Sequence, residues 1–229
     1  KIHYYKKILN LLKKIQMIKT NRIKTFLKTN HKISKYSKNK LINESNLFLE
    51  WYLPRYIKGN KKKIIKKKIS KIFKELINQL IYKKKVFVHR DFHVSNIMIT
   101  KKGLGLIDNQ DALFGNISYD LASLIDDVRF KTSIKTKTFI FNEFLKINFS
   151  IDKKKFKNDF EILSVMRNLK IIGIFTRLSI RDKKNKYLKL IPYAWKLIEA
   201  RLASNEKLKN LKTVLDENFN KKIRRSYEN

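Results

Sequence analysis

A short block of strand-forming sequence at residues 86–108 limits what this chain can fold into more than any other feature. Three apolar, β-prone runs follow one another there, at residues 86–88, 96–100 and 104–107. The turn Lys101-Lys102-Gly103 separates the last two runs. The rest of the chain is dominated by apolar residues at helical spacing. We therefore predict an α+β protein that is mainly α, with a small β-hairpin region.

Helices are predicted on both sides of this block, because Gly and Pro occur only 5 and 2 times in 229 residues. The polar segment 20–42, with its apolar cluster Thr25-Phe26-Leu27, is interpreted as a loop with a short helix. The basic run 61–68 is interpreted as the solvated start of a helix, and the tail 221–225 as frayed. The predicted helices cover residues 3–19, 45–57 (kinked near Pro54), 69–81, 119–129, 134–147, 154–178, 187–202 and 205–218.

Composition narrows the class of protein further. Hydrophobic residues make up 43% of the chain, enough for one large domain or two small ones with a real core. The chain has no Cys, which excludes disulfides, thiolate metal sites and Cys nucleophiles and fits a cytoplasmic location. There is no run of about 18 apolar residues, so no membrane-spanning helix is expected.

The formal net charge of +36 has two interpretations. One is a partner rich in phosphate, such as nucleic acid or an anionic membrane. The other is a coding bias, since Lys, Ile and Asn are all abundant and share codons rich in A and T. We favour the second, because Lys outnumbers Arg, which dedicated phosphate readers prefer, and the lysines are scattered. No specific nucleic-acid partner is therefore expected.

Polar side chains stand at the ends of the predicted strands. Asp91 follows the first strand, Asn96 opens the second and Asp108 ends the third. If the second and third strands form a hairpin, these three oxygen-bearing side chains meet at one edge. A carboxylate and an amide carbonyl suit Mg²⁺, and a further carboxylate can accept the proton of an attacking hydroxyl. This arrangement favours phosphoryl transfer, and it follows the kinase pattern H-R-D-x-x-x-x-N.

The segment 86–112 resembles the aminoglycoside phosphotransferase and choline kinase superfamily, which shares the protein kinase-like fold. That superfamily commonly has H-x-D-x-H-x-x-N, matched by residues 89–96, and I-D-x-x-x-A, matched by residues 107–112. Tyr119-Asp120-Leu121-Ala122 also matches. No Ala-Pro-Glu segment follows, which argues against a protein substrate.

A closer similarity is to the cell-wall amino-sugar kinases of this superfamily, which phosphorylate N-acetylmuramate and N-acetylglucosamine at the anomeric hydroxyl. This resemblance implies an ATP- and Mg²⁺-dependent kinase that acts on a small-molecule hydroxyl in cell-wall recycling. The similar segments are residues 48–52, 89–96, 110–115 with 119–121, and 166–170 continuing through 173–175 to Arg181.

The resemblance also implies a role for individual residues. Asp91 would be the catalytic base, and Asn96 and Asp108 would bind Mg²⁺ that bridges the ATP phosphates. His89, grouped with the catalytic residues, would hold the catalytic loop together with Asp120 through hydrogen bonds.

Four further residues each have two alternative assignments. His93 could be a metal ligand, but we favour a loop-orienting imidazole because no second His or Cys accompanies it. Asp111 would face either the substrate or a second metal. Glu50 and Trp51 have two interpretations, as sugar contacts or as a helix-surface carboxylate and a core aromatic.

No nucleotide-binding motif is found in the sequence. Both G-x-x-x-x-G-K-[ST] and G-x-G-x-x-G are absent, and no β-rich block precedes His89. We therefore expect residues 1–229 to be the C-terminal catalytic lobe, with the N-terminal nucleotide-binding lobe missing. The alternatives are an aminoglycoside, choline or homoserine kinase of the same superfamily, and a non-enzymatic Lys-rich protein that binds nucleic acid. The sequence does not indicate an oligomeric state.

Overall fold

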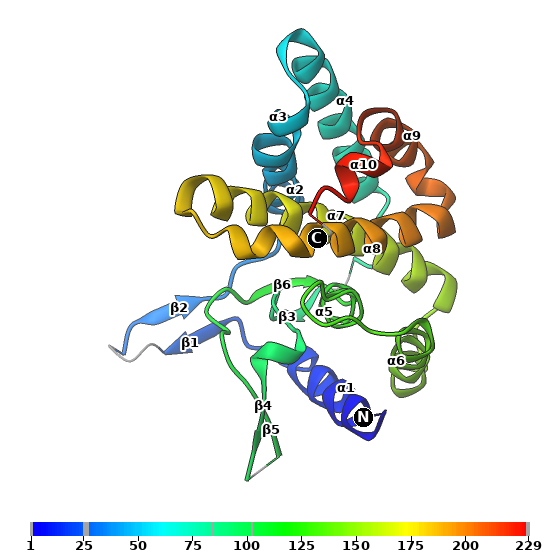
Figure 1. Cartoon of the computed structure of the whole chain (residues 1–229). Helices are drawn as coiled ribbons and strands as arrows, with labels where there is room; N and C mark the ends of the chain where they lie inside the picture. The colour runs from blue at the N-terminus through cyan, green and yellow to red at the C-terminus, as the bar shows by residue number, and fades with distance from the viewer. Residues whose placement is uncertain (1, 25–27, 84, 102, 228–229) are drawn as a thin grey trace. The chain divides into compact units, whose positions relative to one another are not determined.

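The computed structural model of the protein describes residues 2–24, 28–83, 85–101 and 103–227 (Figure 1). The apolar cluster Thr25-Phe26-Leu27 and the turn residue Lys102 lie outside the described residues. The chain divides into two compact units. Unit 1 combines Lys1–Ser37 with Ile81–Phe160, and unit 2 combines Lys38–Leu80 with Glu161–Asn229.

Among the described residues, unit 1 contains all the strands together with three complete helices. A further helix, α7 (Lys153–Asp182), begins in this unit and ends in unit 2. The elements of unit 1 are α1 (Ile2–Gln16), β1 (Arg22–Lys24), β2 (Asn30–Lys32), β3 (Lys85–Val88), the 3₁₀ turn η2 (Val94–Asn96), β4 (Ile97–Thr100), β5 (Gly103–Leu106), β6 (Leu113–Asn116), α5 (Tyr119–Ile125) and α6 (Ile134–Ile147).

The strands form three antiparallel pairs. β4 and β5 form the predicted hairpin, with Ile97 opposite Leu106 and Thr100 opposite Gly103. The prediction missed β6, which pairs with β3 through Lys85 opposite Asn116 and Val88 opposite Leu113. β6 contains Gly and Asn, which are weak strand formers, so its pairing depends on β3. The pair β1–β2 replaces the predicted loop, and all six of its residues are exposed, so no apolar alternation revealed it.

The core of unit 1 lies between α1, α5, α6 and the loop that follows β3. The apolar face of α1 is turned inward, with Leu9 and Leu12 almost completely buried. Phe144 of α6 stacks on Phe156, and both rings are fully buried. Phe92, which directly follows Asp91, belongs to the same cluster. The catalytic-loop sequence is therefore anchored to the core by its own aromatic residue.

Unit 2 is helical throughout its described residues. Its elements, besides the second part of α7, are α2 (Lys38–Leu47), the π-helical turn η1 (Phe48–Tyr52), α3 (Leu53–Tyr56), α4 (Gly59–Asn78), η3 (Asn185–Leu190), α8 (Ile191–Ser204), η4 (Glu206–Leu208), α9 (Lys209–Asn218) and α10 (Lys221–Arg224). The basic run 61–68 lies inside α4 and is mostly exposed, as the amphipathic pattern predicts.

The helix predicted over residues 45–57 begins earlier, at Lys38, and widens before Pro54 instead of simply kinking. Pro54 has no backbone N–H, so the carbonyl of Glu50 lacks its ordinary i+4 donor. A π turn at Phe48–Tyr52 is a common way to accommodate such a defect. The turn places Phe48 and Tyr52 in the core of unit 2, where Trp195 Nε1 donates a hydrogen bond of 3.0 Å to the Tyr52 hydroxyl.

The prediction of a frayed tail is wrong for residues 221–224. They form α10, and the Arg224 guanidinium lies 4.7 Å from the centre of the Trp195 ring. The same guanidinium forms ion pairs of 2.9 Å with Glu199 and 2.7 Å with Asp216. Arg224 is only 5% exposed, so a charge that looked like part of a solvated run is a packed, paired side chain. Within the described residues, no helix has the length and apolar character needed to span a membrane.

Candidate active site

The loop between β3 and β4 carries Asp91 and connects the β3–β6 pair to the β4–β5 pair. Asp91 is partly buried, and no described residue forms a hydrogen bond with its carboxylate. Its backbone carbonyl accepts hydrogen bonds from the His93 N–H at 3.0 Å and from Asn96 Nδ2 at 3.0 Å. The backbone of the loop is thus fixed while the Asp91 carboxylate stays available to a ligand.

Asn96 and the strand end before Asp108 are neighbours. The backbone N–H of Ile107 donates to the Asn96 carbonyl at 3.1 Å, which extends the β4–β5 ladder by one step. Since Asn96 Nδ2 donates to the Asp91 carbonyl, its Oδ1 is left for another partner. The hairpin therefore places Asn96 beside the residue that adjoins Asp108, while the Asn96 side chain contacts the Asp91 backbone.

Asp108 is exposed and has a backbone φ of +66°, in the left-handed region. Arg90, in the loop that carries Asp91, also lies in that region, with a φ of +76°. Non-glycine residues adopt this conformation at a cost of roughly 1–3 kcal/mol, and such residues are concentrated at functional sites. One Asp108 carboxylate oxygen accepts a hydrogen bond from Gln110 Nε2, a contact that the sequence reasoning missed. An acid followed two residues later by an amide is too common a pattern to have revealed this contact.

His89 lies behind the loop and is completely buried. Its Nε2 is 3.0 Å from the carbonyl oxygen of Ile107. A carbonyl can only accept, so the Nε2–H donates this hydrogen bond. His89 therefore connects the Asp91 loop to the strand end that carries Asp108. This position suits a residue that orients the loop better than one that touches a substrate.

Asp120, at the start of α5, is fully buried and holds the same loop from the other side. Its two carboxylate oxygens accept the backbone N–H groups of His89 at 2.7 Å and Arg90 at 2.9 Å. These are charge-assisted bonds to residues about thirty positions away in the chain. They tie the loop to α5 and support the left-handed conformation of Arg90.

Asp120→Ala is expected to lower the free energy of unfolding by about 2–6 kcal/mol, because two buried N–H groups lose their acceptor at roughly 1–3 kcal/mol each. Denaturant-induced unfolding followed by circular dichroism measures this. Asp111→Ala serves as the control, since the Asp111 side chain is 70% exposed, and it should change stability by less than about 1 kcal/mol. Equal unfolding midpoints for the two variants would show that Asp120 does not anchor the loop.

Arg90 joins the loop to the segment after Asp108. Its Nη1 donates to the Asp111 carbonyl at 2.9 Å and lies 3.7 Å from the Asp111 carboxylate. Its guanidinium also sits 5.3 Å from the centre of the Tyr36 ring. The Tyr36 hydroxyl lies 3.1 Å from that of Tyr119 and donates to it. Tyr36 was not identified from the sequence, because it lies in the polar, poorly periodic segment before α2.

Two predicted site residues are placed differently from the rest. His93 is only 6% exposed, and among the described residues no group of three or more His, Cys, Asp or Glu side chains is arranged to bind a metal. Glu50 is exposed and lies with Trp51 in η1 of unit 2, whereas the other predicted site residues lie in unit 1. Trp51, beside it, is partly buried.

Comparisons with known proteins identify the family to which this chain belongs. Residues 3–138 match the model of the phosphotransferase enzyme family. The chain is 34% identical over 169 residues to the N-acetylmuramate/N-acetylglucosamine kinase of Neisseria meningitidis, covering 70% of this chain and 50% of that protein. It is 29% identical over 186 residues to the enzyme of the same name from Pseudomonas aeruginosa, covering 79% and 55%. The chain thus spans about half the length of the curated relatives it matches.

Among solved structures, an ethanolamine kinase of Plasmodium vivax superposes on 88% of this chain and 60% of its own, with a TM-score of 0.58 and 14% sequence identity. At that identity the likeness concerns the fold alone. It confirms the prediction of a mainly helical α+β protein with a kinase-like fold.

Proposed function

The chain belongs to the phosphotransferase enzyme family, and from this premise we propose that it is the catalytic lobe of an ATP- and Mg²⁺-dependent kinase that phosphorylates a hydroxyl group of an amino sugar. The observation that carries the proposal is the fixed loop around Asp91, which the hairpin sets beside Asn96 and the strand end before Asp108. The relatives named as N-acetylmuramate/N-acetylglucosamine kinases support the amino-sugar acceptor.

Asp91 is the proposed base. A base must reach the proton that it removes, and the Asp91 carboxylate is partly exposed without a hydrogen-bonding partner among the described residues. The hydrogen bonds to its backbone carbonyl restrict the loop, so the carboxylate can hold the acceptor hydroxyl in one orientation. Orientation and electrostatic stabilisation are the main contributions that a protein makes to phosphoryl transfer.

Asn96 Oδ1 and the Asp108 carboxylate are the proposed Mg²⁺ ligands. One amide oxygen and one carboxylate are hard donors that suit this ion, which takes its other ligands from water and phosphate. A bound Mg²⁺ would neutralise charge on the transferring phosphate. The hydrogen bond from Gln110 to Asp108 and the one from Asn96 to the Asp91 carbonyl orient the two donor groups.

His89 and Asp120 are proposed as positioning residues. Each acts on the loop backbone or on its neighbouring strand end, and neither side chain is exposed to a substrate. Together they hold the Asp91 loop and the Asp108 end at a set separation. Catalysis by positioning is sensitive to displacements on the order of 1 Å, so this support is part of the proposed mechanism.

A phosphate-transfer screen tests the acceptor. The whole gene product is incubated with Mg²⁺ and ATP labelled on its γ-phosphate, separately with N-acetylmuramate, N-acetylglucosamine, choline, homoserine and an aminoglycoside. We expect label on the two amino sugars. That label should be released by mild acid, because a phosphate on an anomeric oxygen is a good leaving group.

Two controls accompany the screen. Omission of Mg²⁺ with added chelator, and the Asp91→Asn variant, should each abolish labelling. Label on choline, homoserine or the aminoglycoside alone would contradict the amino-sugar acceptor and retain the kinase. No label on any compound from a folded protein would contradict the kinase proposal itself.

A further inference from the structure

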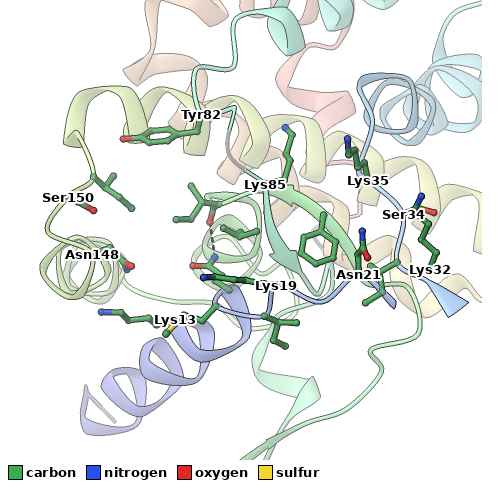
Figure 2. A pocket seen from close by; sticks show the side chains of 18 residues that line it. Lys13, Lys19, Asn21, Lys32, Ser34, Lys35, Tyr82, Lys85, Asn148 and Ser150 are labelled. Carbon is green, nitrogen blue, oxygen red and sulfur yellow. Dashed lines mark hydrogen bonds between the residues drawn. The ribbon is translucent and has the colours of Figure 1, made fainter. Parts of the chain in front are cut away.

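Unit 1 contains a pocket of about 1040 Å³ among its described residues, away from the candidate active site (Figure 2). Its walls are formed by the end of α1, the segments on both sides of β1–β2, the start of β3, the middle of β6 and the α6–α7 connection. In Figure 2, Lys13, Asn148 and Ser150 lie on one side, Lys32, Ser34 and Lys35 lie on the other, and the Lys19 side chain extends between them.

The pocket lies toward the opposite end of the β3–β6 pair from the Asp91 loop. Lys85 and Val86, at the start of β3, line it, whereas the loop begins after Val88 at the other end of the strand. At about 3.3 Å per residue, the two ends of β3 are roughly 10 Å apart. None of His89, Asp91, Asn96, Asp108 or Asp120 lines the pocket.

The charge of the lining has one sign. Among the described residues, the lining includes five lysines and no Asp or Glu, the lysines being Lys13, Lys19, Lys32, Lys35 and Lys85. Lys13, in the lining, donates a 2.6 Å hydrogen bond from its Nζ to the Ile147 carbonyl. Elsewhere in unit 1, Lys137 forms a 2.8 Å ion pair with Asp126, and Lys146 forms one of 2.7 Å with Glu143. Lysine is frequent throughout this chain, so the absence of any carboxylate from the lining is the informative part. Ammonium groups gathered around a concave surface repel one another and attract an anion.

The rest of the lining is apolar or neutral. Phe114, Ile117 and Ile151 are partly buried and Val86 is buried, so the pocket has an apolar floor. Neutral hydrogen-bonding groups are interspersed with it. Gln16 is held by a 3.0 Å hydrogen bond from its Nε2 to the Ile117 carbonyl. Such a mixture of apolar surface and a few polar groups is typical of small-molecule sites, which measure about 300–1,000 Å³.

We propose that this pocket binds a small organic phosphate, with an apolar ring against the Phe114 and Val86 surface and its phosphate among the lysine ammonium groups. Lys19 and Lys35 approach from two separate segments, one after α1 and one after β2. A phosphate between them links these segments. The site is separate from phosphoryl transfer and does not depend on the acceptor proposed above.

Three probes test the proposal by isothermal titration calorimetry on the whole chain, and each shares different features with the proposed ligand. Inorganic phosphate supplies the charge alone, 1-naphthol supplies the ring alone, and 1-naphthyl phosphate supplies both. We expect 1-naphthyl phosphate to bind tightest, with 1:1 stoichiometry. If it binds no tighter than inorganic phosphate, the apolar floor plays no part and the proposal is wrong.

Two double variants with the same change in charge locate the site. Lys19→Gln with Lys35→Gln removes two pocket ammonium groups, and Lys63→Gln with Lys67→Gln removes two exposed ones from α4 in unit 2. Loss of two charge-assisted contacts should weaken 1-naphthyl phosphate binding roughly tenfold or more, whereas the α4 variant should bind as the wild type does. All four positions are exposed, so both variants should keep the wild-type melting temperature, which is measured alongside.

Two outcomes would overturn the proposal. Equal weakening by both double variants would show that the probe responds to the net charge of the protein and not to the pocket. Unchanged binding by the Lys19 and Lys35 variant would show that the probe binds elsewhere, including at the candidate active site.

Discussion

Asp91→Asn is expected to lower the turnover of the whole gene product by about 10²- to 10⁴-fold, the usual contribution of a general base, while the fold stays intact. The side chain keeps its size and polarity but loses the ability to accept a proton. The backbone hydrogen bonds that fix the loop use the Asp91 carbonyl, so the substitution leaves them in place. Stopped reactions with the preferred amino sugar and ATP measure the turnover.

The matched control for Asp91→Asn is Asp152→Asn, the same chemical change at an exposed residue whose carboxylate accepts the Lys155 N–H at the start of α7. Asn is as good an N-cap as Asp, so activity and stability should both stay near those of the wild type. Near-normal turnover of Asp91→Asn, with a normal circular dichroism spectrum, would rule out Asp91 as the base.

Gly173→Ala is expected to lower the free energy of unfolding by about 3 kcal/mol or more, at the upper end of overpacking costs. Gly173 lies in the middle of α7, in unit 2, where Ala would otherwise favour the helix by about 1 kcal/mol. An added Cβ would come within 2.5 Å of the Leu47 carbonyl oxygen and of the Phe48 backbone nitrogen. These are backbone atoms at the junction of α2 and η1, so a rotamer change cannot relieve the clash.

Gly105→Ala is the matched control for Gly173→Ala. There the nearest atom to the added Cβ is the Thr100 methyl group at 3.3 Å, the end of an exposed side chain that can move slightly. We expect a loss of less than about 1 kcal/mol. Urea unfolding of both variants gives the comparison. A Gly173→Ala protein as stable as the wild type, or more stable, would mean that α7 does not approach the α2–η1 backbone so closely.

The β4–β5 hairpin and most helices could be predicted because their signals are local. Ile97–Thr100 and Gly103–Leu106 pair across a two-residue turn, so their register depends on residues a few positions apart. The same holds for Asp91 and Asn96, five positions apart and joined by a hydrogen bond. The helix pattern was likewise correct for α6, whose observed bounds, Ile134–Ile147, equal those predicted.

Contacts between distant residues could not be predicted in the same way. β6 becomes a strand only because β3 lies beside it, and β1–β2 has no apolar alternation. Arg224 looked like part of a solvated basic tail, but its neighbours Trp195 and Glu199 come from another helix. A charge run has the same composition whether its side chains are solvated or paired, so only packing distinguishes the two cases.

The sequence by itself determined the chemistry offered at residues 89–108: one carboxylate after a strand, and an amide and a second carboxylate at the ends of a hairpin. Only the tertiary structure decided that Tyr36 also contacts this loop, through Arg90, from a segment far along the chain. It alone also gathered five lysines from separate segments around one pocket. The physical reason is that short-range hydrogen bonds leave a pattern in neighbouring residues, whereas packing between remote segments depends on shape and leaves none.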